Sequence, residues 1–182
     1  MPFAAARALA LFDGKMRTAI HRLKFEGRRD LGPILGEMLA VFVRRSGALG
    51  CADVVVPVPL HAARRQERGY NHALLLAEPV ARDLGAGLLA DGLMRVAATA
   101  PQSELRREQR WANVAAAFAV PRKSVGQLQG RAILLVDDVM SSGATAAECA
   151  RTLLCAGVAS VYVATLARAM PPPGRGYARG GR

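Results

Sequence analysis

The chain has few cysteines, no long apolar run and fewer acidic than basic residues, and each of these shortages argues against particular classes of protein. Only three cysteines occur in 182 residues, at Cys51, Cys149 and Cys155. They are too few for a disulfide framework or a four-ligand zinc site within this chain, and they favour a reducing, cytoplasmic setting. No run of eighteen apolar residues is present. The sequence therefore predicts a globular protein without membrane insertion.

The sequence also lacks the short motifs of several common sites. It contains no GxxxxGK[ST], no GxGxxG after a predicted strand and no GxSxG. A P-loop hydrolase and a nucleophile elbow are excluded, and a dinucleotide fold is disfavoured. The three histidines, His21, His61 and His72, lack metal-ligand spacing. We interpret them as polar loop or helix-surface residues, with His61 the best placed to reach a ligand.

The charge balance is strongly positive. Lys and Arg number 25 against 14 Asp and Glu, which gives a net charge of +11. The basic residues are distributed over several groups: 17–29, 64–68, 106–110 and the tail. Such a charge attracts polyanions, and both nucleic acid and a phosphorylated small molecule remain open. The tail, residues 170–182, is rich in Pro, Gly and Arg, so we expect it to be disordered.

The most informative stretch is residues 131–157, RAILLVDDVMSSGATAAECARTLLCAG. Residues 132–136 form an unbroken apolar run that predicts a strand buried on both faces of a parallel sheet. From Gly143 the apolar spacing becomes helical, and Gly157 predicts the helix end. Backbone N–H groups and hydroxyls at such a helix start favour a phosphate. Asp137 and Asp138 would repel it, but they suit sugar hydroxyls or a magnesium ion carried by phosphates.

Further elements follow from the remaining apolar patterns. Residues 12–45 predict two helices joined near 26–32, and a solvated helix end is favoured over ligand contact for Lys24, Arg28 and Arg29. Residues 52–58 predict a core strand that prolines terminate, followed by a basic loop. Residues 72–84 predict a helix that Pro79 kinks or divides. Residues 159–167 predict a strand parallel to the one at 132–136. Between these elements, residues 99–115 are polar and rich in Arg and Gln. Either a lid over a site or an exposed charged helix at 104–111 would explain them.

At ILLVDDVMSSGAT the chain resembles the signature of type I phosphoribosyltransferases that binds 5-phosphoribosyl 1-diphosphate (PRPP). Further matches are similar to the ComF family, phosphoribosyltransferase-like proteins associated with natural competence and DNA uptake. These matches are RLKFEG at 22–27, VPVPLH at 56–61, RGYN at 68–71, and Gln102, Arg110, Asn113 and Phe118. The resemblance implies an α/β fold with an open, mostly parallel sheet flanked by helices. It also implies a small N-terminal helical hood over residues 1–50, a phosphoribosyltransferase-like core over 51–169 and the basic tail.

The resemblance also implies a role for each matching residue. Asp137 and Asp138 would hold the ribose hydroxyls, directly or with Mg²⁺ nearby, and are the candidate catalytic and metal residues. The 5′-phosphate would be held by Ser141, Ser142, Gly143, Ala144 and Thr145. The pyrophosphate would lie against the loop of Pro57, Val58 and Pro59, with Arg68 as its countercharge. Arg110 falls where these enzymes carry a flexible catalytic loop and is the third catalytic candidate.

The sequence is compatible with three functions. The first is PRPP binding with Mg²⁺ and transfer or hydrolysis of the phosphoribosyl group, with the acceptor unidentified. The second is an inactive accessory protein that handles single-stranded DNA with the competence machinery, and the third is a regulator that senses PRPP. A homodimer is common among relatives, and the sequence leaves the oligomeric state open. Two departures matter: family members commonly begin with a Cys-rich zinc module that these cysteines cannot supply, and His72 stands where Gln is more usual.

Overall fold

A five-stranded parallel sheet forms the centre of the molecule in the computed structural model, which describes residues 1–49, 51–97 and 114–170. The strand order is β1-β7-β6-β2-β3, and each neighbouring pair is parallel. The strands are β1 (Ala5–Leu11), β2 (Val54–Pro57), β3 (Gly87–Leu88), β6 (Ala132–Met140) and β7 (Ser160–Arg168). The predicted open, parallel sheet is therefore confirmed.

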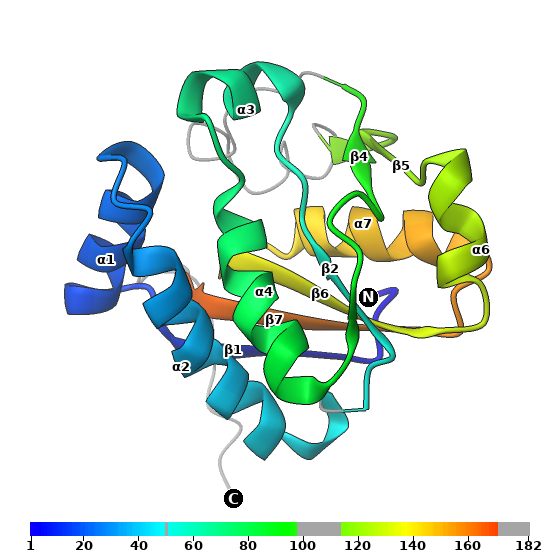
Figure 1. The fold of residues 1–182 in the computed structure, drawn as a ribbon, viewed down its shortest axis with the longest axis horizontal. Helices are drawn as coiled ribbons and strands as arrows, with labels where there is room; N and C mark the ends of the chain where they lie inside the picture. The colour runs from blue at the N-terminus through cyan, green and yellow to red at the C-terminus, as the bar shows by residue number, and fades with distance from the viewer. Residues whose placement is uncertain (50, 98–113, 171–182) are drawn as a thin grey trace, which may run out of the picture.

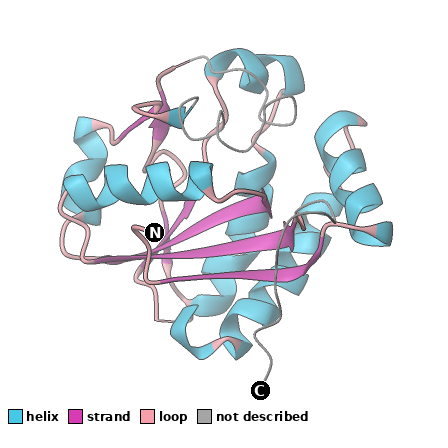
Figure 2. Ribbon diagram, turned by 180° about the vertical axis from the view of Figure 1, so that it is seen from behind, coloured by secondary structure: helices cyan, strands magenta, loops and turns pink. Residues whose placement is uncertain are grey.

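Helices cover both faces of this sheet (Figures 1 and 2). One face carries α1 (Gly14–Phe25), α2 (Leu31–Arg45) and α4 (His72–Leu84), and the other carries α7 (Ala144–Cys155). Side chains of β6 alternate between the two faces because the side-chain period of a strand is two. Leu134 and Val136 pack with α1, α2 and α4, whereas Ile133 and Leu135 pack with α7. The same alternation directs Asp137 toward the α7 face and Asp138 toward the face of α1, α2 and α4.

The unit of β6, α7 and β7 agrees with the prediction for residues 131–157 and 159–167. The difference lies at the end of β6, which continues through both aspartates to Met140 instead of ending at Val136. Pairing with β7 extends the strand, since Asp137 lies opposite Thr165 and Met140 opposite Arg168. The aspartates are therefore held by a sheet and not by a loop.

The N-terminal region differs from the expected helical hood. Ala5–Leu11 forms β1 and pairs with β7 along its whole length. Alanine is a strong helix former, but the open edge of β7 offers hydrogen bonds that outweigh local propensity. The two helices expected after it are present. Moreover, α2 packs tightly on α4, because a Cβ at Gly36 would lie 2.7 Å from Pro79 Cγ. Residues 31–45 therefore share the core with the sheet.

Short elements complete the fold beyond the end of β2. The expected loop after β2 instead contains α3 (Ala62–Arg68), which is capped by the His61 side chain and ends at Gly69 with φ +74°. Pro79 does not divide α4. A small antiparallel sheet joins β4 (Met94–Arg95) and β5 (Phe118–Ala119), and it is followed by two short helical turns, η3 (Arg122–Ser124) and α6 (Val125–Leu128). A further turn, η1 (Gly47–Leu49), follows α2.

Two predicted features lie outside the described residues: most of the segment at 99–115 and the basic tail beyond Met170. Within the described part of the chain, none of the helices has the length and apolar character needed to cross a membrane.

Candidate functional site

A small hollow lies at the carboxyl end of β6, where the chain turns into α7. It is lined by Asp137, by Thr165 of β7 and by the turn residues Ser141, Gly143, Ala144 and Thr145. Gly143 precedes α7 with φ +81°, a conformation that favours glycine. The hollow therefore combines a carboxylate, hydroxyl groups and the N-terminus of a twelve-residue helix. Ser142 borders a neighbouring hollow on the β1 side of the same turn.

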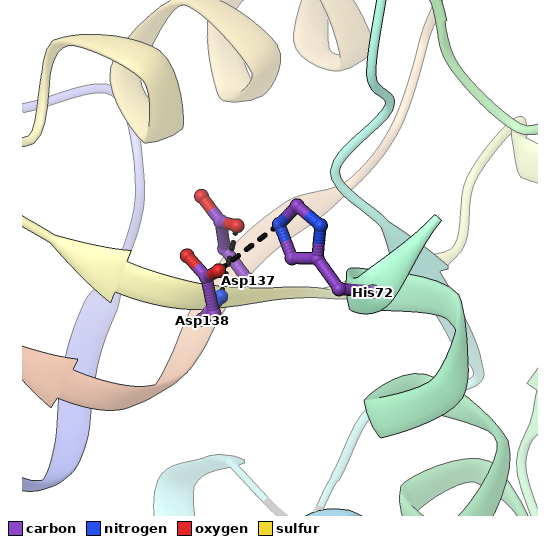
Figure 3. Close-up of side chains that lie close together, drawn as sticks. All are labelled: His72, Asp137 and Asp138. Atoms are coloured by element: carbon purple, nitrogen blue, oxygen red, sulfur yellow. Dashed lines mark hydrogen bonds and ion pairs between the residues drawn. The ribbon is translucent and has the colours of Figure 1, made fainter. Parts of the chain in front are cut away.

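Asp138 contacts two side chains, Lys24 and His72, on the side of the sheet that carries α1 and α4, and Figure 3 shows His72 beside the two aspartates. Its Oδ2 lies 2.7 Å from Lys24 Nζ of α1 and 3.0 Å from His72 Nε2 of α4. Asp138 is 2% exposed and His72 4%, so this cluster is buried apart from part of the Lys24 side chain. Three elements far apart in the sequence thus meet on one carboxylate oxygen.

The cluster fixes the charge state of Asp138. Burial alone would raise the pKa of this carboxyl, but the opposing charges of Lys24 and His72 outweigh it and hold the pKa well below its usual range. Asp138 is therefore ionised at all physiological pH values. Its charge is matched within the protein before any ligand arrives.

Asp137 has the opposite electrostatic character. Its Oδ1 accepts a hydrogen bond from the backbone N–H of Asp138 at 2.8 Å. Burial, followed by the neighbouring negative charge of Asp138, raises the pKa of Asp137 to about 6, although Lys24 and His72 oppose the shift. Asp137 is the carboxylate that lines the hollow. Among the described residues, Asp137 makes no ion pair, in contrast to Asp138.

Together these side chains present a possible set of metal ligands. One donor atom from each of His72, Asp137 and Asp138 lies within 4.8 Å of the others. Lys24 already occupies the ion-pair position on Asp138 Oδ2, so a cation that bound there would meet a like charge. Asp137 has no such competitor among the contacts described above. The geometry thus favours Asp137 as the residue that contacts a cation carried by a ligand.

The predicted pyrophosphate loop lies beside this site. Val58 N donates to Val136 O at 2.9 Å, and Asn71 Nδ2 donates to Val58 O at 3.2 Å. The structure thus brings Pro57, Val58 and Pro59 to the end of β6. The Arg68 guanidinium, in contrast, stacks on the ring of Phe25, 4.8 Å from its centroid. Arg110 lies outside the described residues.

Comparison with known proteins gives several relatives. The chain is 36% identical over 154 residues to the DNA utilization protein YhgH of Salmonella typhi and to that of Escherichia coli K12, covering 83% of this chain and 66% of each relative. It is 34% identical over 153 residues to competence protein F of Haemophilus influenzae, covering 82% of this chain and 66% of that protein. The chain belongs to the ComF family. The resemblance drawn from its motifs is thereby confirmed, although no protein-family model matches the chain.

Two further comparisons relate this ComF-family chain to phosphoribosyltransferases. Adenine phosphoribosyltransferase of Rhodococcus jostii is 31% identical over 140 residues, which cover 75% of this chain and 71% of the enzyme. Glutamine PRPP amidotransferase from B. subtilis, solved with ADP and GMP, matches 81% of this chain and 30% of that chain, with a TM-score of 0.53 and 20% identity. At this identity the structural match shows the fold alone.

The ComF-family chain spans 66% of the length of the YhgH and competence protein relatives. The activity, substrates and partners of the whole protein are therefore matters of proposal.

Lys24 and His72 are the site residues that sequence reasoning missed. The solvated helix end expected for Lys24 is wrong, since its amine reaches a buried carboxylate. The surface position expected for His72 is also wrong, because this first residue of α4 faces the sheet. A signal was present for Lys24, which lies inside the family motif RLKFEG. No sequence signal identified the role of His72.

Proposed function

We propose that this ComF-family protein binds PRPP with Mg²⁺ and transfers its phosphoribosyl group to an acceptor or to water. The observation that carries the proposal is the hollow where Asp137 faces the turn from Ser141 to Thr145 at the start of α7. A helix N-terminus with hydroxyl groups suits a phosphate, and an adjacent carboxylate suits ribose hydroxyls. Family membership and the phosphoribosyltransferase-like fold support the same substrate.

In this proposal the two carboxylates have different tasks. Asp137 accepts hydrogen bonds from the ribose hydroxyls, because it borders the hollow. Asp138 stabilises the site from the opposite side of β6, through its contacts with Lys24 of α1 and His72 of α4. The 5′-phosphate would lie against Ser141, Ser142, Gly143, Ala144 and Thr145.

The donor set fits a magnesium ion that arrives with the diphosphate. Mg²⁺ prefers oxygen ligands and retains several waters, so one carboxylate is a sufficient protein contribution. Asp137 would supply that oxygen, and the charge of Lys24 makes direct contact by Asp138 less favourable. When bound, Mg²⁺ would neutralise charge on the diphosphate leaving group.

The reaction would break the bond between the ribose anomeric carbon and the diphosphate oxygen, and the diphosphate would leave with the electron pair. The acceptor nitrogen or water oxygen would form the new bond to that carbon and then lose a proton. Such a transition state resembles an oxocarbenium ion. The protein's part is to hold the ribose, exclude water and stabilise charge, so a protein nucleophile is not required.

Calorimetric titration of PRPP with Mg²⁺ tests the binding step. The proposal predicts saturable binding that Asp137→Asn abolishes, and absence of binding at millimolar PRPP would refute it. A screen for pyrophosphate release from PRPP against nucleobases and amines then tests transfer and identifies the acceptor. Binding without release in every reaction would favour a PRPP-sensing regulator.

A second candidate function is the handling of single-stranded DNA without transferase activity. It is favoured by the net charge of +11 and by relatives named for DNA utilization and competence. Electrostatic binding to phosphates predicts an affinity for an oligonucleotide that falls steeply with added salt. Absence of binding at low salt would exclude this function.

A further inference from the structure

Large hydrophobic side chains are exposed in a row along one side of α2. Ile34 is 58% exposed, Met38 48% and Val41 38%. They follow Leu31 at spacings of three, seven and ten residues, so all four lie on one side of the helix. Single exposed hydrophobics are common on protein surfaces, whereas a contiguous row of them is typical of a surface that binds another molecule.

This row borders an open groove between α1 and α2, which we call the α1–α2 groove. The groove has a volume of about 550 Å³ and is lined by Gly14, Lys15, Thr18, Ala19, Arg22 and Leu31. Ala19 and Leu31 also pack against the core beneath it. Because Leu31 both lines the groove and begins the row, the exposed side chains of α2 extend its apolar side. The surface is therefore concave, with one apolar wall.

The α1 side of the groove is basic. Lys15 makes no ion pair within the described part of the chain, and Arg22 has only a contact of 3.8 Å with the exposed carboxylate of Glu26. Arg45, which ends α2, follows the apolar row and is exposed. None of the described residues that line the groove is acidic. The groove therefore combines an apolar wall with positive charge at its margins.

The shape of the groove favours a helix as its occupant. A groove between two helices accepts the row of side chains that a third helix presents, as in helix packing generally. An anionic lipid surface would also suit basic and apolar side chains. However, membrane binding buries an apolar face that projects into the lipid, and a concave groove does not offer one.

Charge then selects among possible helices and chain segments. A second copy of this chain would carry the same net charge of +11 and the same basic margins, so two grooves facing each other would repel. The C-terminal residues 171–182 contain three arginines and no acidic residue, so they also have the wrong charge. A negatively charged helix would be attracted to the groove and oriented by its margins.

We propose that the α1–α2 groove binds an acidic amphipathic helix of a partner protein. The apolar side chains of that helix would contact Leu31, Ile34 and Met38, and its carboxylates would face Lys15 and Arg22. The inference is independent of the proposed function. Lys24, which contacts Asp138, lies about 200° around α1 from Arg22, so an occupied groove leaves the hollow beside Asp137 open.

The test is calorimetric titration with two synthetic helical peptides of about eighteen residues each. The first has Leu at spacings i, i+3, i+7 and i+10 and Glu at the flanking positions, and the second has Lys in place of each Glu. We expect the Glu peptide to bind with a dissociation constant of about 10–100 µM and the Lys peptide at least about tenfold more weakly. Absence of Glu-peptide binding at millimolar concentration, or equal affinity for both peptides, would overturn the proposal.

Substitutions in the groove locate the binding. Ile34→Asp and Met38→Asp should each weaken Glu-peptide binding by about tenfold or more, because they place a carboxylate in the apolar contact. Lys15→Glu should weaken it by about threefold to tenfold and reduce its dependence on salt. These side chains are exposed, so circular dichroism should show unchanged folding. Should Ile34→Asp fail to fold, Met38→Asp and Lys15→Glu decide the matter.

Two matched variants outside the groove serve as controls. Leu154→Asp replaces a partly exposed leucine of α7, on the other face of the sheet. Arg17→Glu reverses the charge of an exposed arginine of α1 that does not line the groove. Each should leave Glu-peptide affinity within about threefold of wild type, as screened surface charges do. Losses equal to those of Ile34→Asp and Lys15→Glu would overturn the location.

The remaining outcomes assign the groove to another occupant. Analytical ultracentrifugation of the protein alone would overturn the proposal if it showed a dimer that Ile34→Asp dissociates, since the occupant would then be a second copy. Cosedimentation with vesicles of phosphatidylcholine and phosphatidylserine would overturn it if Ile34→Asp abolished vesicle binding. Glu-peptide binding by a protein that does not bind PRPP would leave this inference standing and refute the proposed function alone.

Discussion

The carboxyl end of β6 has two faces with opposite electrostatic character. On the side of α1 and α4, Asp138 is buried and its charge is matched by Lys24 and His72. On the α7 side, Asp137 borders a hollow, and its pKa is raised to about 6 by burial and by the charge of Asp138. Of two adjacent aspartates, Asp138 thus stabilises the fold on one face, whereas Asp137 is the residue to which the proposed function assigns the ligand.

This difference follows from the period of the strand. A sheet directs consecutive side chains to opposite faces, so a pair of aspartates at the end of a buried strand meets two different environments. The matched face organises three elements of the fold. On the α7 face, Asp137 makes no ion pair among the described residues, and a carboxyl pKa raised in this way is typical of binding-site carboxylates.

The largest expected effect is that of Asp138→Asn. It leaves the amine of Lys24 without its countercharge, and removal of one partner from a buried ion pair costs about 3–5 kcal/mol of unfolding free energy. We expect the melting temperature to fall by about 10 °C for a chain of this size, as followed by circular dichroism. A change below about 1 kcal/mol would show that the cluster does not organise the fold.

Asp137→Asn should act in the opposite direction. The folded-state pKa of about 6 lies above the usual 3.8, so ionised Asp137 opposes folding at neutral pH. Asparagine should therefore raise the unfolding free energy by about 1–3 kcal/mol at pH 8.

The pH dependence of the stabilisation by Asp137→Asn is the control for this prediction. As the pH falls from 8 through 6 toward 4, Asp137 takes up its proton in the folded protein before it does so in the unfolded chain. The ionisation penalty therefore disappears, and so should most of the advantage of Asp137→Asn. Denaturant titrations of wild type and Asp137→Asn at pH 8 and pH 4, in chelator-containing buffer, measure this difference in unfolding free energy. A gain equal at pH 8 and pH 4 would contradict the assignment.

Lys24→Met tests the matched face from the cation side. Lys24 keeps 22% of its side chain exposed, so solvent moderates the loss, and we expect a destabilisation of about 1–3 kcal/mol. Combined with Asp138→Asn, it should cost less than the sum of the two single variants, because both remove one interaction. Lys15→Met on the exposed face of the same helix is the matched control and should change the free energy by less than about 0.5 kcal/mol.

The smallest expected effect lies in the turn before α7. Ser141→Ala removes one hydroxyl that lines the hollow and should leave the melting temperature unchanged. Ribose 5-phosphate affinity should fall by about five- to tenfold, the usual net value of one hydrogen bond. Calorimetry with the sugar phosphate measures this, and an unchanged affinity would place the phosphate elsewhere.

The sequence allowed the central unit of the fold to be predicted, because the apolar run at 132–136 and the helical spacing after Gly143 are strong local signals. β1 was not predicted, since its alanines favour a helix locally and only the edge of β7 makes it a strand. The same limit applies to the site. Asp137 and the turn after it are contiguous in sequence, whereas Lys24 and His72 reach Asp138 through tertiary packing that no local pattern encodes.

The proposed role of Asp137 is tested most directly by a calorimetric titration of PRPP with Mg²⁺ into wild type and Asp137→Asn. We expect saturable binding to wild type and none to the variant, even though the variant should be the more stable protein at pH 8. Equal affinity for both proteins, or no binding to wild type at millimolar PRPP, would contradict it.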